Sequence, residues 1–132
     1  MKRGNPLRWD CETRGCFNLL ARPKIEVFHD CFPRGINFGD VDGLVEVGGK
    51  FCMLEWKSPG GTVGVGQARS HAAFTRTPGN IVFVVEGDAE TMAISRYSVV
   101  WNGRRRTAQE ATLDELKGRI RKWCAWADSG PI

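Results

Sequence analysis

The order of apolar and polar positions divides the chain into short helices and strands. The run Ile81-Val82-Phe83-Val84-Val85 is apolar throughout, which is typical of a strand buried on both faces of a sheet. Thr112 followed by Glu115 is the pattern of a capping box, and it predicts the start of a final helix. The predicted elements are a helix at 5–21, a strand at 24–28, a Pro/Gly loop at 31–39, a hairpin at 40–57, a helix at 65–75, strands at 81–85 and 92–101, and a helix from 112 to about 127.

This order predicts an α/β fold with a mixed central sheet flanked by helices. It reads helix–strand–strand–strand–helix–strand, followed by an extra C-terminal strand and helix. In the last helix the apolar residues Leu116, Ile120, Trp123 and Ala127 fall on one face, which indicates core packing. The strand at 92–101 is interpreted either as an edge strand or as a segment near an interface between two copies of the chain.

The hairpin carries an unusual arrangement of charge. If Gly48-Gly49 forms a two-residue turn, Val47 pairs with Lys50, and counting back places Asp42 directly opposite Glu55. Opposed residues on one face have Cβ atoms roughly 4.5–5.5 Å apart. Two carboxylates at that spacing repel each other unless a cation lies between them or one holds a proton. Oxygen ligands so placed suit Mg²⁺ or Mn²⁺, so the pattern predicts a metal site.

A solvated hairpin face is the competing interpretation, because charged residues on hairpins usually face water. Apolar neighbours on both strands favour a core position instead, and a ladder arranged for stability would not place acid against acid. In the same register Asp40 falls opposite Lys57, where it pairs with the lysine or adds an outer carboxylate. The Gly-rich segment 58–67 that follows offers backbone N–H groups to a phosphate.

Asp42 and the Glu55-Trp56-Lys57 triplet thirteen residues later resemble the PD-(D/E)xK nuclease core. Restriction endonucleases, Holliday-junction resolvases and many phage and repair nucleases share this restriction-endonuclease-like fold. Gln67 resembles the extra glutamine of its exonuclease-like and VRR-type branches, and Glu12 stands where the family often has an acid on the first helix. The similarity covers roughly residues 8–87.

Two positions depart from the family pattern. Val41 replaces the proline that gives the motif its first letter, and His71 stands where the RecB-type branch has tyrosine. Neither His71 nor His29 has a cysteine at zinc-ligand spacing. Each is therefore interpreted as an ordinary surface histidine or one satisfied by hydrogen bonds.

The resemblance implies an αβββαβ core and metal-dependent hydrolysis of phosphodiester bonds in DNA. Asp42, Glu55 and the backbone carbonyl of Trp56 would hold Mg²⁺ or Mn²⁺, and Lys57 would act on the attacking water and the phosphate. Gln67 and Glu12 are further candidate catalytic residues. A structure-selective endonuclease of phage or mobile-element type, such as a junction resolvase, is the preferred function. An exonuclease and a non-catalytic nucleic-acid-binding protein remain alternatives.

Composition agrees with this interpretation. At 132 residues the chain is expected to form one nuclease domain, and its formal net charge is +4. Basic residues are concentrated in the last third, which suits a polyanionic partner: Arg104, Arg105, Arg106, Lys117, Arg119, Arg121 and Lys122. For those of the final helix, a solvated helix face explains the charge equally well. The resemblance implies branched or duplex DNA as the partner. The three arginines are expected to lie in a loop. A junction-cleaving enzyme of this size is expected to act as a homodimer.

The five cysteines are an odd number with no C-x-x-C pair, and no signal peptide or long apolar segment is apparent. A cytoplasmic location in a bacterial or phage-infected cell, away from membranes, is the corresponding expectation.

Overall fold

A computed structural model describes residues 23–130 of the chain. The chain forms two compact units, Met1–Asp40 and Val41–Ile132. In the first, a 3₁₀ helix, η1 (Ile25–Cys31), precedes an irregular segment in which Phe38 makes edge-to-face contacts with Phe28 and Phe32. The irregular segment agrees with the predicted Pro/Gly loop. The predicted helix at 5–21, with Glu12, lies outside the described residues.

The strand predicted at 24–28 is wrong, because this segment belongs to η1. A strand needs a neighbouring strand for its N–H and C=O groups, whereas here these groups bond locally. Val27 N–H donates to the carbonyl of Lys24 at 3.2 Å, and His29 Nδ1 lies 3.1 Å from the carbonyl oxygen of Glu26. No residue of η1 is buried, so its apolar side chains supply no core.

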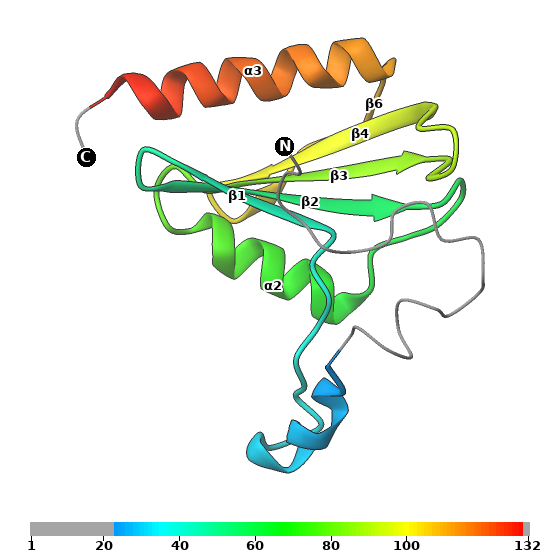
Figure 1. The fold of residues 1–132 in the computed structure, drawn as a ribbon, viewed down its shortest axis with the longest axis vertical. Coiled ribbons are helices and arrows are strands. Elements are labelled where there is room, and N and C mark those ends of the chain that lie inside the picture. Colours follow the sequence, from blue (N-terminus) through cyan, green and yellow to red (C-terminus); the bar gives the residue numbers. More distant parts are fainter. Residues whose placement is uncertain (1–22, 131–132) are drawn as a thin grey trace, which may run out of the picture. The chain divides into compact units, whose positions relative to one another are not determined.

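The second unit is built on a mixed, open sheet of six strands (Figure 1). The strands are β1 (Gly43–Val47), β2 (Lys50–Lys57), β3 (Ile81–Gly87), β4 (Ile94–Trp101), β5 (Arg104–Arg105) and β6 (Gln109–Glu110). They are ordered β1-β2-β3-β4-β5, with β6 also pairing with β4. Only β2 and β3 run parallel, joined through α2 (Val65–Thr75); the other pairs are antiparallel.

The predicted hairpin is confirmed at its turn. Gly48 and Gly49 have φ values of 57° and 84°, which suit the two-residue turns whose twist matches that of the strands. Val47 pairs with Lys50 as predicted, and the ladder ends at Gly43 opposite Leu54. A side chain at position 48 would also meet the carbonyl oxygen of Ala127 at 2.3 Å, so glycine is required there for a second reason.

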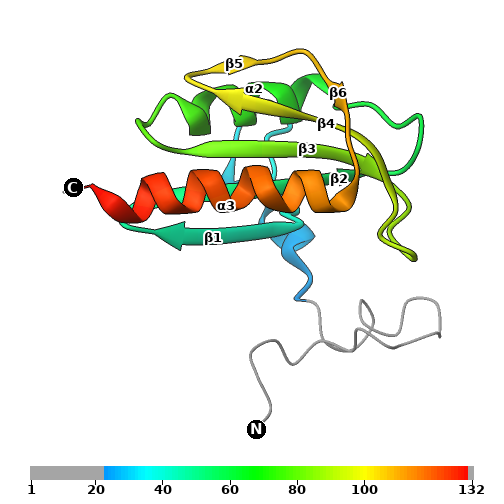
Figure 2. The ribbon, with the colours of Figure 1, turned by 90° about the horizontal axis from the view of Figure 1, so that it is seen from above.

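Two helices cover opposite faces of this sheet (Figures 1 and 2). Ile81, Phe83 and Val85 of β3 point toward α3 (Leu113–Ser129), where they pack with the buried residues Leu116, Trp123 and Ala127. The alternate residues, Val82 and Val84, join a second cluster with Val100, Met53, Val63 and Phe74 on the side of α2. The unbroken apolar run of β3 therefore fills two cores at once.

The final helix begins as predicted. Thr112 Oγ1 accepts the Glu115 N–H at 3.2 Å, and Glu115 Oε1 accepts the Thr112 N–H at 2.8 Å, which completes the capping box. Near the other end, Lys50 Nζ donates to the carbonyl of Ala127 at 3.4 Å and lies 5.3 Å from the centre of the Trp126 ring. Lys50 thus ties the hairpin turn to the end of α3.

β4 is an internal strand, because β3 pairs with one of its edges and β5 and β6 pair with the other. The interpretation of 92–101 as an edge strand is therefore wrong, and its place near an interface between copies stays a prediction. Its buried residues Tyr97, Ser98 and Val100 give it an ordinary place in the core.

The mixed α/β class is confirmed, but only two of the three strands expected before α2 are present among residues 23–130. None of the helices in this part of the chain combines the length and apolar character needed to cross a bilayer.

Candidate active site

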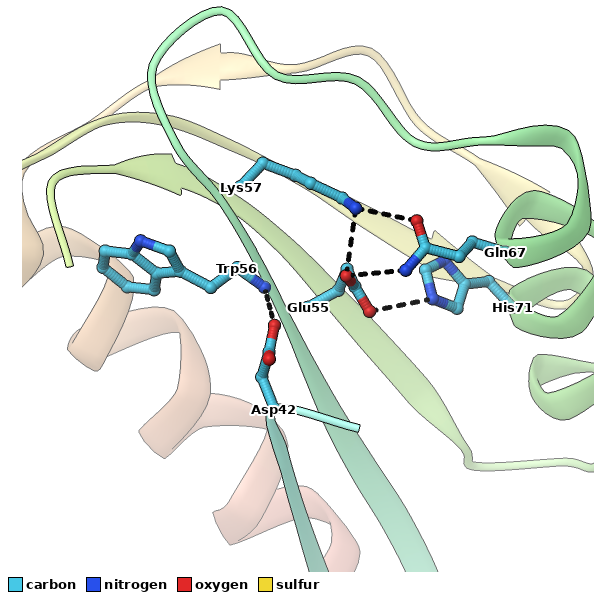
Figure 3. Close-up of polar contacts among 6 residues, drawn as sticks. All are labelled: Asp42, Glu55, Trp56, Lys57, Gln67 and His71. Carbon is cyan, nitrogen blue, oxygen red and sulfur yellow. Dashed lines mark hydrogen bonds and ion pairs between the residues drawn. The ribbon is translucent and has the colours of Figure 1, made fainter. Parts of the chain in front are cut away.

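Glu55 is a nearly buried carboxylate surrounded by polar side chains (Figure 3). Its Oε2 accepts a hydrogen bond from Gln67 Nε2 at 2.9 Å and lies 3.2 Å from Lys57 Nζ. Lys57 Nζ also donates to Gln67 Oε1 at 2.7 Å, so the three side chains close a triangle. His71 Nε2 approaches the other carboxylate oxygen, Oε1, at 3.7 Å. A buried negative charge is tolerable here because a cation and a donor compensate it.

Two short-range periodicities bring this cluster together. Alternation along β2 places Glu55 and Lys57 on one face, and α2 covers that face. Trp56 packs against the core on the α3 side, where its Nε1 donates to the carbonyl of Gly87 at 3.0 Å. On α2, Gln67 and His71 are four residues apart and so lie on one face of the helix.

Asp42 lies beside this cluster but in a different way from the prediction. The β1–β2 ladder stops at Gly43, so neither Asp42 nor Asp40 occupies the predicted pairing position. Asp42 Oδ2 instead accepts the backbone N–H of Trp56 at 2.6 Å (Figure 3). The carboxylate takes the place of the next ladder acceptor, and so it contacts the main chain of Trp56, the residue whose carbonyl is a predicted metal ligand.

The donor set suits a hard divalent cation that keeps part of its hydration. Within residues 23–130, no three His, Cys, Asp or Glu side chains form a group able to hold a metal ion. Mg²⁺ commonly uses one or two carboxylates and fills its other positions with water and substrate phosphate. Asp42 and Glu55 are the two candidate carboxylates here, and Asp42 Oδ1 accepts no hydrogen bond from a described residue.

His71 was not predicted as a site residue. Its side chain is buried, and burial lowers its pKa below the usual 6.5, outweighing the nearby Glu55, which raises it. Arg105 and Lys57 lower the pKa further through their charge. His71 is therefore neutral at pH 7. The sequence signal for His71 as a site residue is its position four residues after Gln67, which places both side chains on one face of a helix.

This lowered pKa makes stability depend on pH. The unfolded chain takes up a proton near pH 6.5, while folded His71 resists it, so stability should fall as pH drops from 6.5 through the lower folded pKa. The effect is at most about 1.4 kcal/mol per pH unit. Urea unfolding of His71→Gln and wild type between pH 5 and 8 should show a flatter profile for the variant.

The exposed His29 provides the matched control, since His29→Gln removes an imidazole outside the sheet. Identical pH profiles for wild type and His71→Gln would show that burial of His71 has no such effect.

The three consecutive arginines are not simply a loop, because Arg104 and Arg105 form β5. Arg105 Nε donates to Ser98 Oγ at 2.8 Å, and the side chain borders a small hollow of about 30 Å³ beside Lys57. Arg106 lines a much larger cavity that Arg105 does not line. Alternation therefore gives the two neighbouring arginines different surroundings.

The Gly-rich loop after β2 is held by an acid on β3. Glu86 Oε2 accepts the N–H of Gly60 at 2.9 Å, and Glu86 Oε1 lies 3.7 Å from Arg96 Nε. This fixes the loop at the end of β2 where Lys57 emerges.

Comparison of the chain with protein-family models, curated proteins and solved structures found no match.

Proposed function

We propose that the protein is a divalent-metal-dependent phosphodiester hydrolase that acts on DNA, with a site of the PD-(D/E)xK type. The observation that carries this proposal is the triangle of Glu55, Lys57 and Gln67. An acid and a lysine two residues apart on one strand are residue types of the motif, and a glutamine at the start of the next helix is the extra residue of its exonuclease-like and VRR-type branches.

The order of elements supports the finer fold assignment in part. An antiparallel hairpin, a crossover through α2 and a parallel β3 beside β2 correspond to the ββαβ portion of an αβββαβ core. The remaining helix and strand of that core would have to come from the chain before Gly43.

Asp42, Glu55 and the main-chain carbonyl of Trp56 would hold Mg²⁺ or Mn²⁺. When bound, such an ion acidifies a water molecule and offsets charge on the scissile phosphate. With such an ion bound, Glu55 would no longer depend on Lys57 and Gln67 alone for compensation of its charge, and Lys57 could act on the substrate while Gln67 Oε1 still orients it.

The protein's own groups would supply orientation and charge. The Lys57 side chain is 21% exposed, so its ammonium can reach an attacking water and stabilise the negatively charged phosphorane. Gln67 Oε1 holds that ammonium in place. His71 lies beside Glu55 Oε1 and is neutral at pH 7. It therefore adds no positive charge to those of Lys57 and the proposed metal ion.

A non-catalytic nucleic-acid-binding protein is the second candidate, and one observation favours it. Glu55 already has a cation and an amide donor on the same oxygen, so its charge is compensated by the protein alone. A protein that binds DNA without cleaving it would need no more than this.

An assay on defined DNA substrates tests both candidates. Wild-type protein with Mg²⁺, Mn²⁺ or EDTA is incubated with linear duplex, single-stranded, flap, four-way-junction and covalently closed circular DNA. We expect cleavage only with a metal ion, leaving 5′-phosphate and 3′-hydroxyl ends. Cleavage of closed circles identifies an endonuclease, whereas loss of nucleotides only from open ends identifies an exonuclease.

Matched variants assign the activity to the site. Asp42→Ala should remove turnover, while Asp128→Ala, which removes an exposed acid on α3, should leave it unchanged. Binding of DNA without cleavage of any substrate in either metal would reject the hydrolase in favour of the non-catalytic candidate.

A further inference from the structure

A cavity of about 610 Å³ lies on the α3 side of the sheet. It is bounded by α3, by β4 and by the segment that leads from β5 to β6, all within the second unit of the chain. Figure 2 shows α3 running across this face, whereas Glu55 and Lys57 contact α2 on the opposite face. Its volume is that of a small-molecule site, and it is separate from the candidate active site.

The charge of this cavity is positive and uncompensated. Arg106, Arg119 and Lys122 line it, and no acidic side chain does. None of the three forms an ion pair with any residue between 23 and 130, unlike Lys57 and Arg96 on the other face. Three cations converging without a counter-charge repel each other, so a bound anion would relieve that repulsion.

The same cavity is rich in aromatic rings. Tyr97, Trp101, Trp123 and Trp126 line it, and so three of the chain's five tryptophans gather here. Trp126 is 49% exposed and packs edge-to-face against Trp101, with the ring centres 5.6 Å apart. Hydrogen bonds hold Trp123 and Tyr97 in place: Trp123 Nε1 donates to the carbonyl of Gly79, and Tyr97 Oη accepts from Nε2 of Gln109, which also lines the cavity.

We propose that this cavity binds an unpaired nucleotide within a nucleic-acid strand. Indole rings offer stacking surfaces to any base, and paired arginine and lysine groups bind the adjoining phosphates. A strand is favoured over a free nucleotide because the lining cations come from two sides of the cavity, Arg106 from the segment between β5 and β6 and Arg119 and Lys122 from α3, and so can hold more than one phosphate. The site needs no metal and no cleavage chemistry, so it stands independently of the proposed hydrolase.

Two double variants of equal charge test the cationic part. Fluorescence anisotropy with a labelled oligo(dT) strand, in EDTA to prevent cleavage, measures affinity for each. Arg106→Ala with Lys122→Ala removes two cavity cations, and we expect a loss of about tenfold or more. The slope of log affinity against log salt should fall by roughly 1.4, or about 0.7 for each phosphate contact. Lys117→Ala with Arg121→Ala should stay within about twofold of wild type.

The aromatic part is tested by removing the base or the indole. Trp126→Ala should weaken oligo(dT) binding by roughly five- to a hundred-fold, and Trp126→Phe should restore part of it. An abasic strand of equal length should bind wild type and Trp126→Ala alike. Thermal unfolding of each variant confirms that it is folded.

Several results would overturn the proposal. These are equal loss of affinity in the two double variants, binding of the abasic strand as tight as that of oligo(dT), or a preference for duplex over single strands. Tight binding of dTMP alone, equal to that of the oligomer, would replace the strand with a free nucleotide.

Discussion

Lys57→Ala is expected to abolish DNA cleavage while making divalent-metal binding tighter. The ammonium lies 3.2 Å from Glu55 Oε2, where it opposes the approach of a second cation to the same carboxylate. In the proposed site, its removal leaves the candidate ligands Asp42 and Glu55 in place but takes away the group proposed to act on water and phosphate. We expect a fall in turnover of at least about 10²- to 10³-fold, by analogy with the loss of one transition-state donor.

Steady-state cleavage and calorimetric titration with Mn²⁺ at pH 8 measure the two effects separately. Glu55→Ala should lose both cleavage and metal binding, since it removes a proposed ligand. Lys117→Ala, which deletes an exposed lysine of α3, should change neither. If Lys57→Ala binds metal more weakly than wild type, the ammonium does not compete with the ion. If it cleaves at near the wild-type rate, the catalytic role of Lys57 is refuted.

Trp123→Ala should destabilise the protein more than any other single change on α3. The side chain is 3% exposed, packs in the core with Phe83 and Tyr97, and donates to the carbonyl of Gly79 at 3.0 Å. Truncating a buried tryptophan costs about 3–5 kcal/mol. Single domains are stable by only about 5–15 kcal/mol, so the variant should be close to unfolding at 37 °C. Thermal unfolding should show a Tm lower by more than about 12 °C.

Two controls separate packing from hydrogen bonding. Trp123→Phe keeps an aromatic ring but leaves the buried Gly79 carbonyl without its donor, which costs about 1–3 kcal/mol. Trp126→Ala, three residues along the same helix but half exposed, should cost only about 1 kcal/mol through its lost ring and cation contacts. Equal losses at positions 123 and 126 would contradict the assigned core.

The parts of the fold that follow from short-range patterns could be predicted from the sequence. The Gly48-Gly49 turn, the bounds of α2, the buried run of β3 and the Thr112–Glu115 capping box all depend on residues a few positions apart. The association of Glu55, Lys57 and Gln67 was predicted for a related reason. Strand alternation and the motif spacing bring these residues together without knowledge of the distant chain.

Features that depend on distant contacts could not be predicted in this way. The segment at 24–28 has strand-like composition, but a strand forms only where a partner is available. Whether Asp42 and Asp40 pair in the ladder depends on where β1 begins, and it begins at Gly43, after both of them. The burial of His71 requires the sheet to lie beneath α2. The cavity beneath α3 gathers residues from three elements and has no local signal.

The turn between β4 and β5 makes the edge of the sheet unusually sensitive to a change in length. Asn102 and Gly103 have φ values of 52° and 80°, and this two-residue turn sets Trp101 opposite Arg104 and Val100 opposite Arg105. One residue inserted there would turn each arginine to the other side of the sheet. Arg105 would no longer border the small hollow beside Lys57, and Arg106 would no longer line the aromatic cavity. Families of such proteins should therefore tolerate substitutions at these arginines more readily than a single-codon insertion or deletion in the turn.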